Sequence, residues 1–212
     1  MIIAVDGTLA SGKGTVARGI AAAFGLAHLD TGALYRAVAV EILKSGGNPR
    51  DPMAAKKAAQ TLDPTLIDEA AIRTAEAGAA ASVVAVQSDV RDALFDLQRR
   101  FAEQPGGAVL DGRDIGTVVC PDADVKFYID AKPRIRAERR WRELVVQGDT
   151  VQLEDIEQQL AERDQRDSSR ETAPLMRAED AVLLDTTHLS IDATLAEAVR
   201  IISNTTGVAP RN

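Results

Sequence analysis

Residues 2–15 read IIAVDGTLASGKGT, and the segment that follows at residues 16–26 reads VARGIAAAFGL. The first four of these residues form an apolar run that is typical of a buried strand, and the apolar residues of 16–26 recur with helical spacing. Between them, residues 7–15 fit the pattern GxxxxGK, with a hydroxyl residue two positions after the lysine. The stretch therefore predicts a strand, a glycine-rich loop and a helix in immediate succession.

The loop has the chemistry of a phosphate-binding site. Its glycines let backbone N–H groups converge on a phosphate at the N-terminus of a helix. Lys13 would supply a positive charge, and Thr15 a hydroxyl group near a bound Mg²⁺. The alternative, a glycine-rich turn without a ligand, does not require the lysine and the hydroxyl group at these positions. The predicted binding loop consists of Gly7, Thr8, Leu9, Ala10, Ser11, Gly12, Lys13, Gly14 and Thr15.

Strand and helix patterns alternate along the rest of the chain. Four further apolar runs are typical of buried parallel strands, and longer segments with helical spacing separate them. The alternation predicts an α/β fold with a five-stranded parallel sheet and helices on both faces. A ligand of such a sheet binds at the carboxyl ends of the strands. The expected strands are 2–5, 27–30, 108–110, 125–129 and 181–184, and the expected later helices are 31–44, 132–147, 153–167 and 191–203.

Composition and charge exclude several classes of function. The 212 residues include 25 basic and 32 acidic side chains, for a formal net charge of −7, which argues against a general DNA- or RNA-binding protein. Cys120 is the only cysteine, so neither an intramolecular disulfide nor a cysteine-based zinc site is expected. His28 and His188 lie far apart and are interpreted as packing or surface residues. Because the sequence has neither a secretory signal nor a long apolar span, we expect a cytoplasmic protein with no membrane or nucleic-acid partner.

Three further blocks of sequence point to one family. They are LDTGALYR at 29–36, DGRDIGTVV at 111–119 and ERDQRDSSRETAPL at 162–175, in this order after the GKGT of the loop. Together they resemble the bacterial cytidylate kinases, which belong to the nucleoside monophosphate kinase family of P-loop kinases. The resemblance implies transfer of the γ-phosphoryl group of ATP to CMP or dCMP, with Mg²⁺, by a monomer. It also implies a single kinase domain of residues 1–212, with a core at about 1–45, 105–148 and 178–212, a helical acceptor-binding insert at about 46–104 and a short arginine-rich lid at about 149–177.

The resemblance assigns acceptor binding to the ends of the second and third predicted strands. Asp30, Thr31 and Arg36 match the family's acceptor contacts, with Arg36 on the acceptor phosphate. Arg113 would hold the same phosphate, and Asp111 would act through magnesium-bound water or orient Arg113. From the residues alone, Thr31 is also a candidate helix cap, and the DGRD sequence a turn that ends a strand.

Recognition of the base depends on the polar edge of cytosine, which carries an N4 amino donor where uracil carries an acceptor oxygen. A carboxylate accepts a hydrogen bond from N4 and repels O4 of uracil, so Asp114 suits this position. By resemblance, Ser82 and Arg91 supply the other base contacts, with Arg91 donating to N3 and O2. Without the resemblance, Ser82 is a serine inside a helix and Arg91 a residue of the first turn of one.

The lid segment is rich in arginine although the whole protein is acidic. Arg163, Arg166 and Arg170 recur at intervals of three and four residues, so one helical face could direct three guanidinium groups at phosphate oxygens. Asp164 and Asp167 would hold these arginines when no ligand is bound. By resemblance this lid closes over ATP and excludes water.

A second group of arginines, at residues 134–142, has a solvated helix face as its alternative interpretation. By resemblance Arg139 belongs to the ATP site. The expected catalytic residues are Lys13, Asp111, Arg113, Arg163 and Arg170, and the expected acceptor-binding residues are Asp30, Thr31, Arg36, Ser82, Arg91, Arg113, Asp114, Arg163, Asp167 and Arg170.

The sequence departs from the family pattern at residues 61–77, TLDPTLIDEAAIRTAEA, which are too few for the extra stranded segment of the longer bacterial members. Three other functions remain open on the residues: another small-molecule P-loop kinase with a UMP, shikimate or gluconate acceptor, a GTPase switch, and a non-catalytic nucleotide-binding regulator. The GTPase lacks support because the chain has no NKxD motif to read guanine. Lys13, Arg113, Arg163 and Arg170 argue against the regulator. The preference for CMP or dCMP, and for ATP or GTP, is left open.

Overall fold

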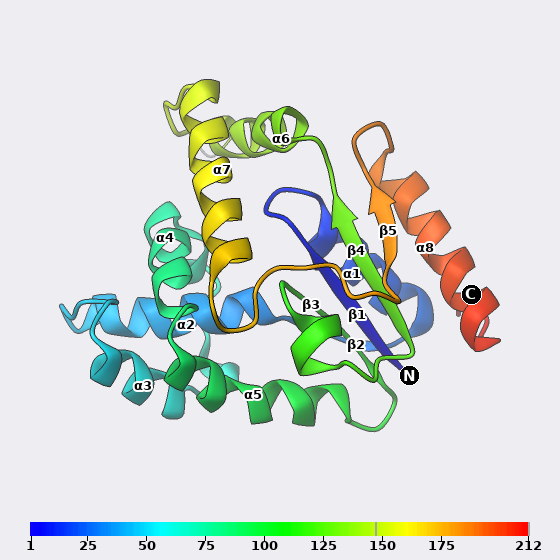
Figure 1. Cartoon of the computed structure of the whole chain (residues 1–212), viewed down its shortest axis with the longest axis horizontal. Coiled ribbons are helices and arrows are strands. Elements are labelled where there is room, and N and C mark those ends of the chain that lie inside the picture. The colour runs from blue at the N-terminus through cyan, green and yellow to red at the C-terminus, as the bar shows by residue number, and fades with distance from the viewer. Residues whose placement is uncertain (147, 212) are drawn as a thin grey trace.

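The computed structural model describes residues 1–146 and 148–211. Within these residues, five parallel strands form one sheet in the order β2-β3-β1-β4-β5 (Figure 1). β1 lies at the centre, where the connections diverge to its two sides, and its carboxyl end leads into the phosphate loop. This is the parallel α/β sheet that the sequence predicts. The strands are β1 (Ile2–Gly7), β2 (Ala27–Asp30), β3 (Ala108–Gly112), β4 (Val125–Asp130) and β5 (Val182–Asp185).

Helices cover both faces of the sheet, as predicted. On one face, α1 (Lys13–Phe24) and α8 (Ile191–Thr206) pack against the alternate residues of β1 and β4. On the other face, the end of α5 (Ser88–Ala102) and a single π-helical turn, η3 (Ile115–Val119), enclose Leu110. The two separate clusters arise because successive side chains of a strand point to opposite faces.

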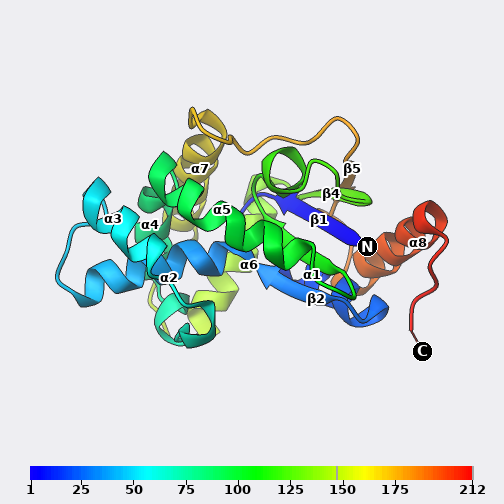
Figure 2. The ribbon, with the colours of Figure 1, turned by 90° about the horizontal axis from the view of Figure 1, so that it is seen from below.

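A helical insert projects from the carboxyl end of β2. It consists of α2 (Thr31–Lys44), α3 (Pro52–Gln60), α4 (Ala75–Val84) and α5, packed around a core that is rich in alanine. Figure 2 shows this insert at one end of the molecule and α8 at the other. The short segment 61–74, between α3 and α4, contains only two 3₁₀ turns, η1 (Pro64–Leu66) and η2 (Ala71–Arg73).

A pair of helices extends above the strand ends. α6 (Pro133–Val146) packs against α7 (Leu153–Ser169) through Ala137, Leu144 and Leu160. In Figure 1, α7 runs from α6 towards the insert, and so passes over the strand ends. α6 was predicted to extend to about Gln147, which lies outside the described residues.

Two local expectations are wrong. β5 was expected to be a buried strand, but Val182 and Leu183 are 37% and 47% exposed, because β5 is an edge strand with only β4 beside it. Within 134–142, Arg136 does not lie on a solvated face, because it is only 4% exposed and bonded to the phosphate loop. Among the helices of the described residues, none has the length and apolar character needed to cross a bilayer.

Candidate active site

Neighbouring strands hold the phosphate loop in its conformation. Gly7 has a φ of 155°, and a Cβ atom there would lie 2.0 Å from the carbonyl oxygen of Ile129, so only glycine fits. The Thr8 hydroxyl donates to Asp130 Oδ1 at 2.6 Å, and the Ser11 hydroxyl donates to the carbonyl oxygen of Thr8 at 3.0 Å. The loop is therefore shaped before a ligand arrives.

The start of α1 offers donors and positive charge to an anion. Gly12 caps the helix with a φ of 91°, and no side chain of the described residues caps this N-terminus. The first backbone N–H groups of α1 are thus available to a ligand. Desolvation and, to a lesser extent, the nearby Arg113 together lower the pKa of Lys13 to about 8. An anion bound here would relieve both effects.

An open pocket of about 440 Å³ lies on one side of the loop, between α1, α6 and the connection from β5 to α8. Arg139 lines it and donates to the hydroxyl and carbonyl oxygens of Thr186 at 2.9 and 2.6 Å. The Thr186 hydroxyl in turn donates to the carbonyl oxygen of Ser11 at 2.9 Å. The predicted ATP residue Arg139 is therefore fixed beside the phosphate loop.

A narrow chamber of about 70 Å³ lies on the other side of the loop and gathers residues that are far apart in the sequence. They come from the phosphate loop, including Lys13, from the ends of β2 and β3 with the residues that follow them, from the helical insert, and from α7 and the residue after it. Every residue predicted to bind the acceptor lines this chamber. They are Asp30, Thr31, Arg36, Ser82, Arg91, Arg113, Asp114, Arg163, Asp167 and Arg170.

One end of the chamber is built around the Asp114 carboxylate. Arg91 pairs with one of its oxygens, and Arg170 Nη2 donates to the other at 3.4 Å. The Arg91 guanidinium also lies 5.6 Å from the centre of the Tyr35 ring, within cation–π distance. Burial raises the pKa of Asp114, against the pull of the arginines. This end combines a planar donor, a carboxylate acceptor and an aromatic face.

The other end of the chamber contains Arg113 and Arg163, whose guanidinium groups form few hydrogen bonds. Arg113 Nε donates to Asp167 at 2.9 Å, and Arg163 Nη1 donates to the carbonyl oxygen of Gly78 at 3.2 Å. Arg163 Nε is buried and has no hydrogen-bond partner among the described residues. Desolvation and the nearby Arg113 lower the pKa of Arg163 to about 10. A buried guanidinium in this state favours an anionic ligand.

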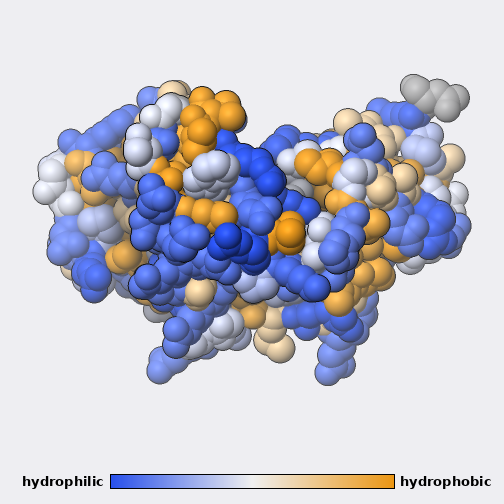
Figure 3. All heavy atoms as spheres, turned by 90° about the horizontal axis from the view of Figure 1, so that it is seen from above, coloured by the Kyte–Doolittle hydropathy of each residue, from blue (hydrophilic) through white to orange (hydrophobic). Residues whose placement is uncertain are grey.

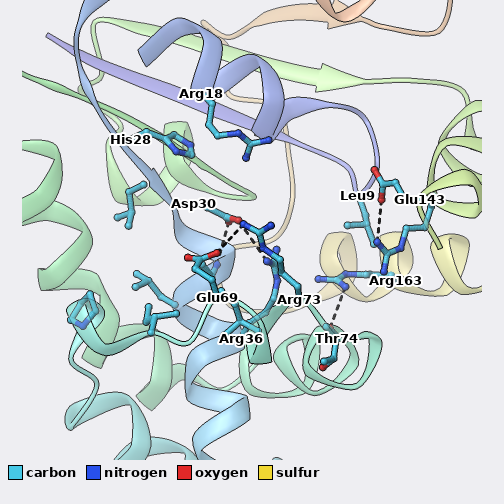
Figure 4. A pocket seen from close by; sticks show the side chains of 18 residues that line it. Leu9, Arg18, His28, Asp30, Arg36, Glu69, Arg73, Thr74, Glu143 and Arg163 are labelled. Carbon is cyan, nitrogen blue, oxygen red and sulfur yellow. Dashed lines mark hydrogen bonds and ion pairs between the residues drawn. The ribbon is translucent and has the colours of Figure 1, made fainter. Parts of the chain in front are cut away.

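A wider cleft of about 940 Å³ continues outward from this end (Figure 4). Arg36 and Asp30, 3.6 Å apart, stand beside Glu69 and Arg73 from the shortened segment. Figure 3 shows hydrophilic residues gathered in a hollow between the two ends of the molecule. The cleft shares Asp30, Arg36 and Arg163 with the chamber, so polar and charged side chains line the route between them.

The chain is similar to known proteins over nearly its whole length. A family model described as "Cytidylate kinase" matches residues 3–204. The chain belongs to the cytidylate kinase family. It is 56% identical over 202 residues to a cytidylate kinase of Xanthobacter autotrophicus, covering 95% of this chain and 97% of the relative, and 53% identical over 207 residues to one of Azorhizobium caulinodans, covering 98% and 100%. A solved structure of an uncharacterized protein from Eubacterium ventriosum shares the fold, with a TM-score of 0.58, 13% identity, and coverage of 96% of this chain and 98% of that one.

Sequence patterns did not predict some residues of this cytidylate kinase site. His28 Nε2 lies 2.8 Å from Asp111 Oδ1, so this histidine adjoins the site instead of serving only in packing. Tyr35, beneath Arg91, is one residue before the predicted Arg36, yet no pattern marks it. Arg73 carries no motif of its own. Strand pairing brings His28 and Asp111 together, and helical periodicity does not reveal it.

Two contacts that the sequence suggested are corrected by the structure. Thr31 does not cap α2: Asp30 does, accepting from Ala33 N, while the Thr31 hydroxyl donates to the carbonyl oxygen of Asp111 at 2.8 Å. Among the described residues, Asp167 and not Asp111 holds the side chain of Arg113.

The expected row of lid arginines is also corrected. α7 ends at Ser169, so Arg170 lies beyond the helix and turns to Asp114, while Arg166 is exposed and lines no part of the chamber. Asp164 pairs with Arg136 at 2.5 Å and not with a lid arginine. A helix C-terminus inside the motif breaks the three-and-four spacing.

Proposed function

We propose that the protein transfers the γ-phosphoryl group of ATP to CMP or dCMP, forming ADP and CDP or dCDP. One observation carries this proposal. The chamber that collects the predicted acceptor residues meets the phosphate loop at Lys13, and the pocket beside Arg139 lies on the other side of the same loop. Two nucleotides can therefore approach Lys13 from opposite sides with their phosphates end to end.

Phosphoryl transfer requires the attacking oxygen, the phosphorus and the leaving oxygen to lie in line, with cations around the transferred group. The acceptor attacks through a phosphate oxygen that is already anionic, so no general base is needed. Lys13, Arg113 and Arg163 would surround the transferred group, and Arg36 and Arg170 would help to hold the acceptor. Because Lys13 and Arg163 are already desolvated, they need little rearrangement as charge moves.

Asp114 and Arg91 would read the base. Cytosine would donate from N4 to the carboxylate and accept at N3 and O2 from the guanidinium. The chamber of about 70 Å³ is too small for a nucleotide as it stands, so the Asp114–Arg91 and Asp114–Arg170 pairs must exchange partners with the ligand. A uracil would place its O4 against the buried carboxylate, and binding would suffer.

Mg²⁺ fits the residues at the start of α1. Among the described residues no group of three or more acidic, histidine or cysteine side chains could hold a metal, and a Mg²⁺ bound mainly by phosphates and water needs no such group. The Thr15 hydroxyl is exposed and accepts from Arg18 Nη2 at 3.3 Å, so it is free to turn to a cation. Bound Mg²⁺ would neutralise phosphate charge. Monomeric state and cytoplasmic location stay predictions.

The test is ADP production with ATP and a panel of CMP, dCMP, UMP, AMP, GMP and shikimate. We expect kcat/KM for CMP or dCMP to exceed that for UMP by about tenfold or more, the discrimination of one well-placed base contact. Higher activity with shikimate or UMP would replace the acceptor in this proposal. Nucleotide binding without ADP release would support a regulator instead.

A further inference from the structure

Asp6 is a buried carboxylate that the reaction does not use. It lies in β1, immediately before the phosphate loop, and is 4% exposed. Its two oxygens accept hydrogen bonds from the backbone N–H groups of Ile115, at 2.8 Å, and Gly116, at 2.7 Å. These partners are more than a hundred residues away in sequence and belong to the first residues of η3.

Within the described residues, Asp6 is the only hydrogen-bond acceptor of these two N–H groups. The first N–H groups of any helical turn lack acceptors within the turn. Ile115 and Gly116 are buried, so water is not a ready substitute, and an unpaired buried N–H is costly. A carboxylate with one oxygen on each N–H satisfies both at once with charge-assisted bonds.

The start of η3 is also where the acceptor residues stand. The peptide group between Asp114 and Ile115 places the Asp114 carbonyl inside η3, where it accepts from Val118 N and Val119 N at 2.9 and 3.1 Å. Fixing the N–H on the other side of this peptide group fixes the backbone from which Asp114 projects. Arg113 is one residue earlier.

We propose that Asp6 is a positioning residue for acceptor recognition: by holding the first two N–H groups of η3, it aims Asp114 at the base and Arg113 at the acceptor phosphate. The inference rests on the proposed function of those two residues. It links the strand that carries the ATP-binding loop to the turn that reads the acceptor.

The charge of Asp6 depends on its neighbours. Burial raises its pKa to about 7, with Asp114 adding to the rise and the two N–H bonds and Arg113 opposing it. A protonated carboxyl keeps one good acceptor oxygen and loses the second bond. The acceptor should therefore bind less well as pH falls below 7. The titratable and charged groups that face Asp6 from the elements around it are Arg113, Asp114, Cys120, Lys126 and Tyr128.

The first test is the Asp6→Asn variant, assayed with the acceptor that the wild type uses best. The asparagine side chain keeps one acceptor oxygen for one of the two backbone N–H groups. Its NH₂ group, a donor, then faces the other backbone N–H, which is also a donor. We expect KM for the acceptor to rise by about tenfold or more, the usual loss for a hydrogen bond to a charged group, while KM for ATP stays within about twofold. Asp124→Asn is the matched control, because Asp124 accepts a hydrogen bond at 2.6 Å from the N–H of Ile2, at the opposite end of β1 from Asp6, and should change neither KM.

The second test uses the wild type and does not depend on whether the variant folds. The backbone amide resonances of Ile115 and Gly116 should shift between pH 6 and 8 with a midpoint near 7, while that of Ile2 should not. Equal changes in both KM values, or unchanged KM values in a folded Asp6→Asn protein, would overturn the positioning role, and flat amide resonances would overturn its expected pH dependence. A wild type that phosphorylates no nucleotide would instead refute the proposed function.

Discussion

Lys13 shows how a single residue prepares the site for a ligand. It stands at the start of α1, where desolvation and Arg113 work against its charge while Asp111 and Asp30 support it. The protonated amine of Lys13 is therefore destabilised by its surroundings as long as no anion is bound. Binding of a polyanion is favoured because it removes this penalty.

Affinity for ATP should depend on the protonation of Lys13. The pKa is about 8, so the amine is charged below this pH and loses its charge above it. We expect the Kd for ATP to be nearly constant from pH 6.5 to 7.5 and to rise above pH 8, by at most about tenfold per pH unit. Titration of ATP at several pH values measures this.

In the Lys13→Ala variant, the Kd for ATP should no longer rise above pH 8. The variant should keep its fold but lower kcat by about a hundredfold or more. Lys44→Ala is the control, because Lys44 is exposed on α2 and should leave kcat and the pH profile unchanged. A wild-type kcat in Lys13→Ala would remove the lysine from the site.

At the scale of elements, α6 and α7 are joined to the phosphate loop by Arg136. Its guanidinium donates to the carbonyl oxygens of Ala131 and Leu9, at 3.0 and 3.2 Å, and to Asp164 at 2.5 Å. One side chain therefore connects the end of β4, the phosphate loop and α7. Movement of α7 must change these contacts.

Replacing Arg136 by alanine should destabilise the protein, because it leaves the partly buried Asp164 without its partner. We expect the free energy of unfolding to fall by about 3 kcal/mol, measured by urea denaturation. Arg134→Ala is the matched variant on the same helix. Its ion pair with Glu157 is solvent-exposed, so the loss should stay below about 1 kcal/mol. Equal losses would show that Arg136 does not join the three elements.

At the scale of the whole molecule, the phosphate loop contributes to two pockets: Lys13 lines the narrow chamber, and its neighbour Gly12 lines the pocket beside Arg139. A compound in which cytidine and adenosine are joined by five phosphates would occupy both. We expect it to raise Tm more than ATP or CMP alone, and a thousandfold excess over Kd would add about 4 kcal/mol of stability. The control is the compound with adenosine at both ends, which lacks cytosine. Equal shifts in Tm with the two compounds would contradict the assignment of the chamber to cytosine.

The strands and most helices were predictable because their signals are local. Apolar runs predicted all five strands, and Gly25 ends α1 in the left-handed conformation expected of a helix cap. The exposed face of β5 was not predictable, because an edge position depends on strand order. The predicted helix end at about residue 167 agrees with the observed end at Ser169, but the helical face expected to include Arg170 was wrong, because Arg170 lies beyond this end.

The sequence by itself determined the phosphate loop, the alternation of strands and helices, and the charged residues that its motifs bring to the chamber, because each of these signals is contained in a short stretch of residues. Only the tertiary structure decided which side chains share a partner. Asp6 meets η3 across 110 residues, and His28 meets Asp111 across 83. Such contacts depend on the order and register of the strands, which the sum of long-range packing decides and no short stretch of sequence contains.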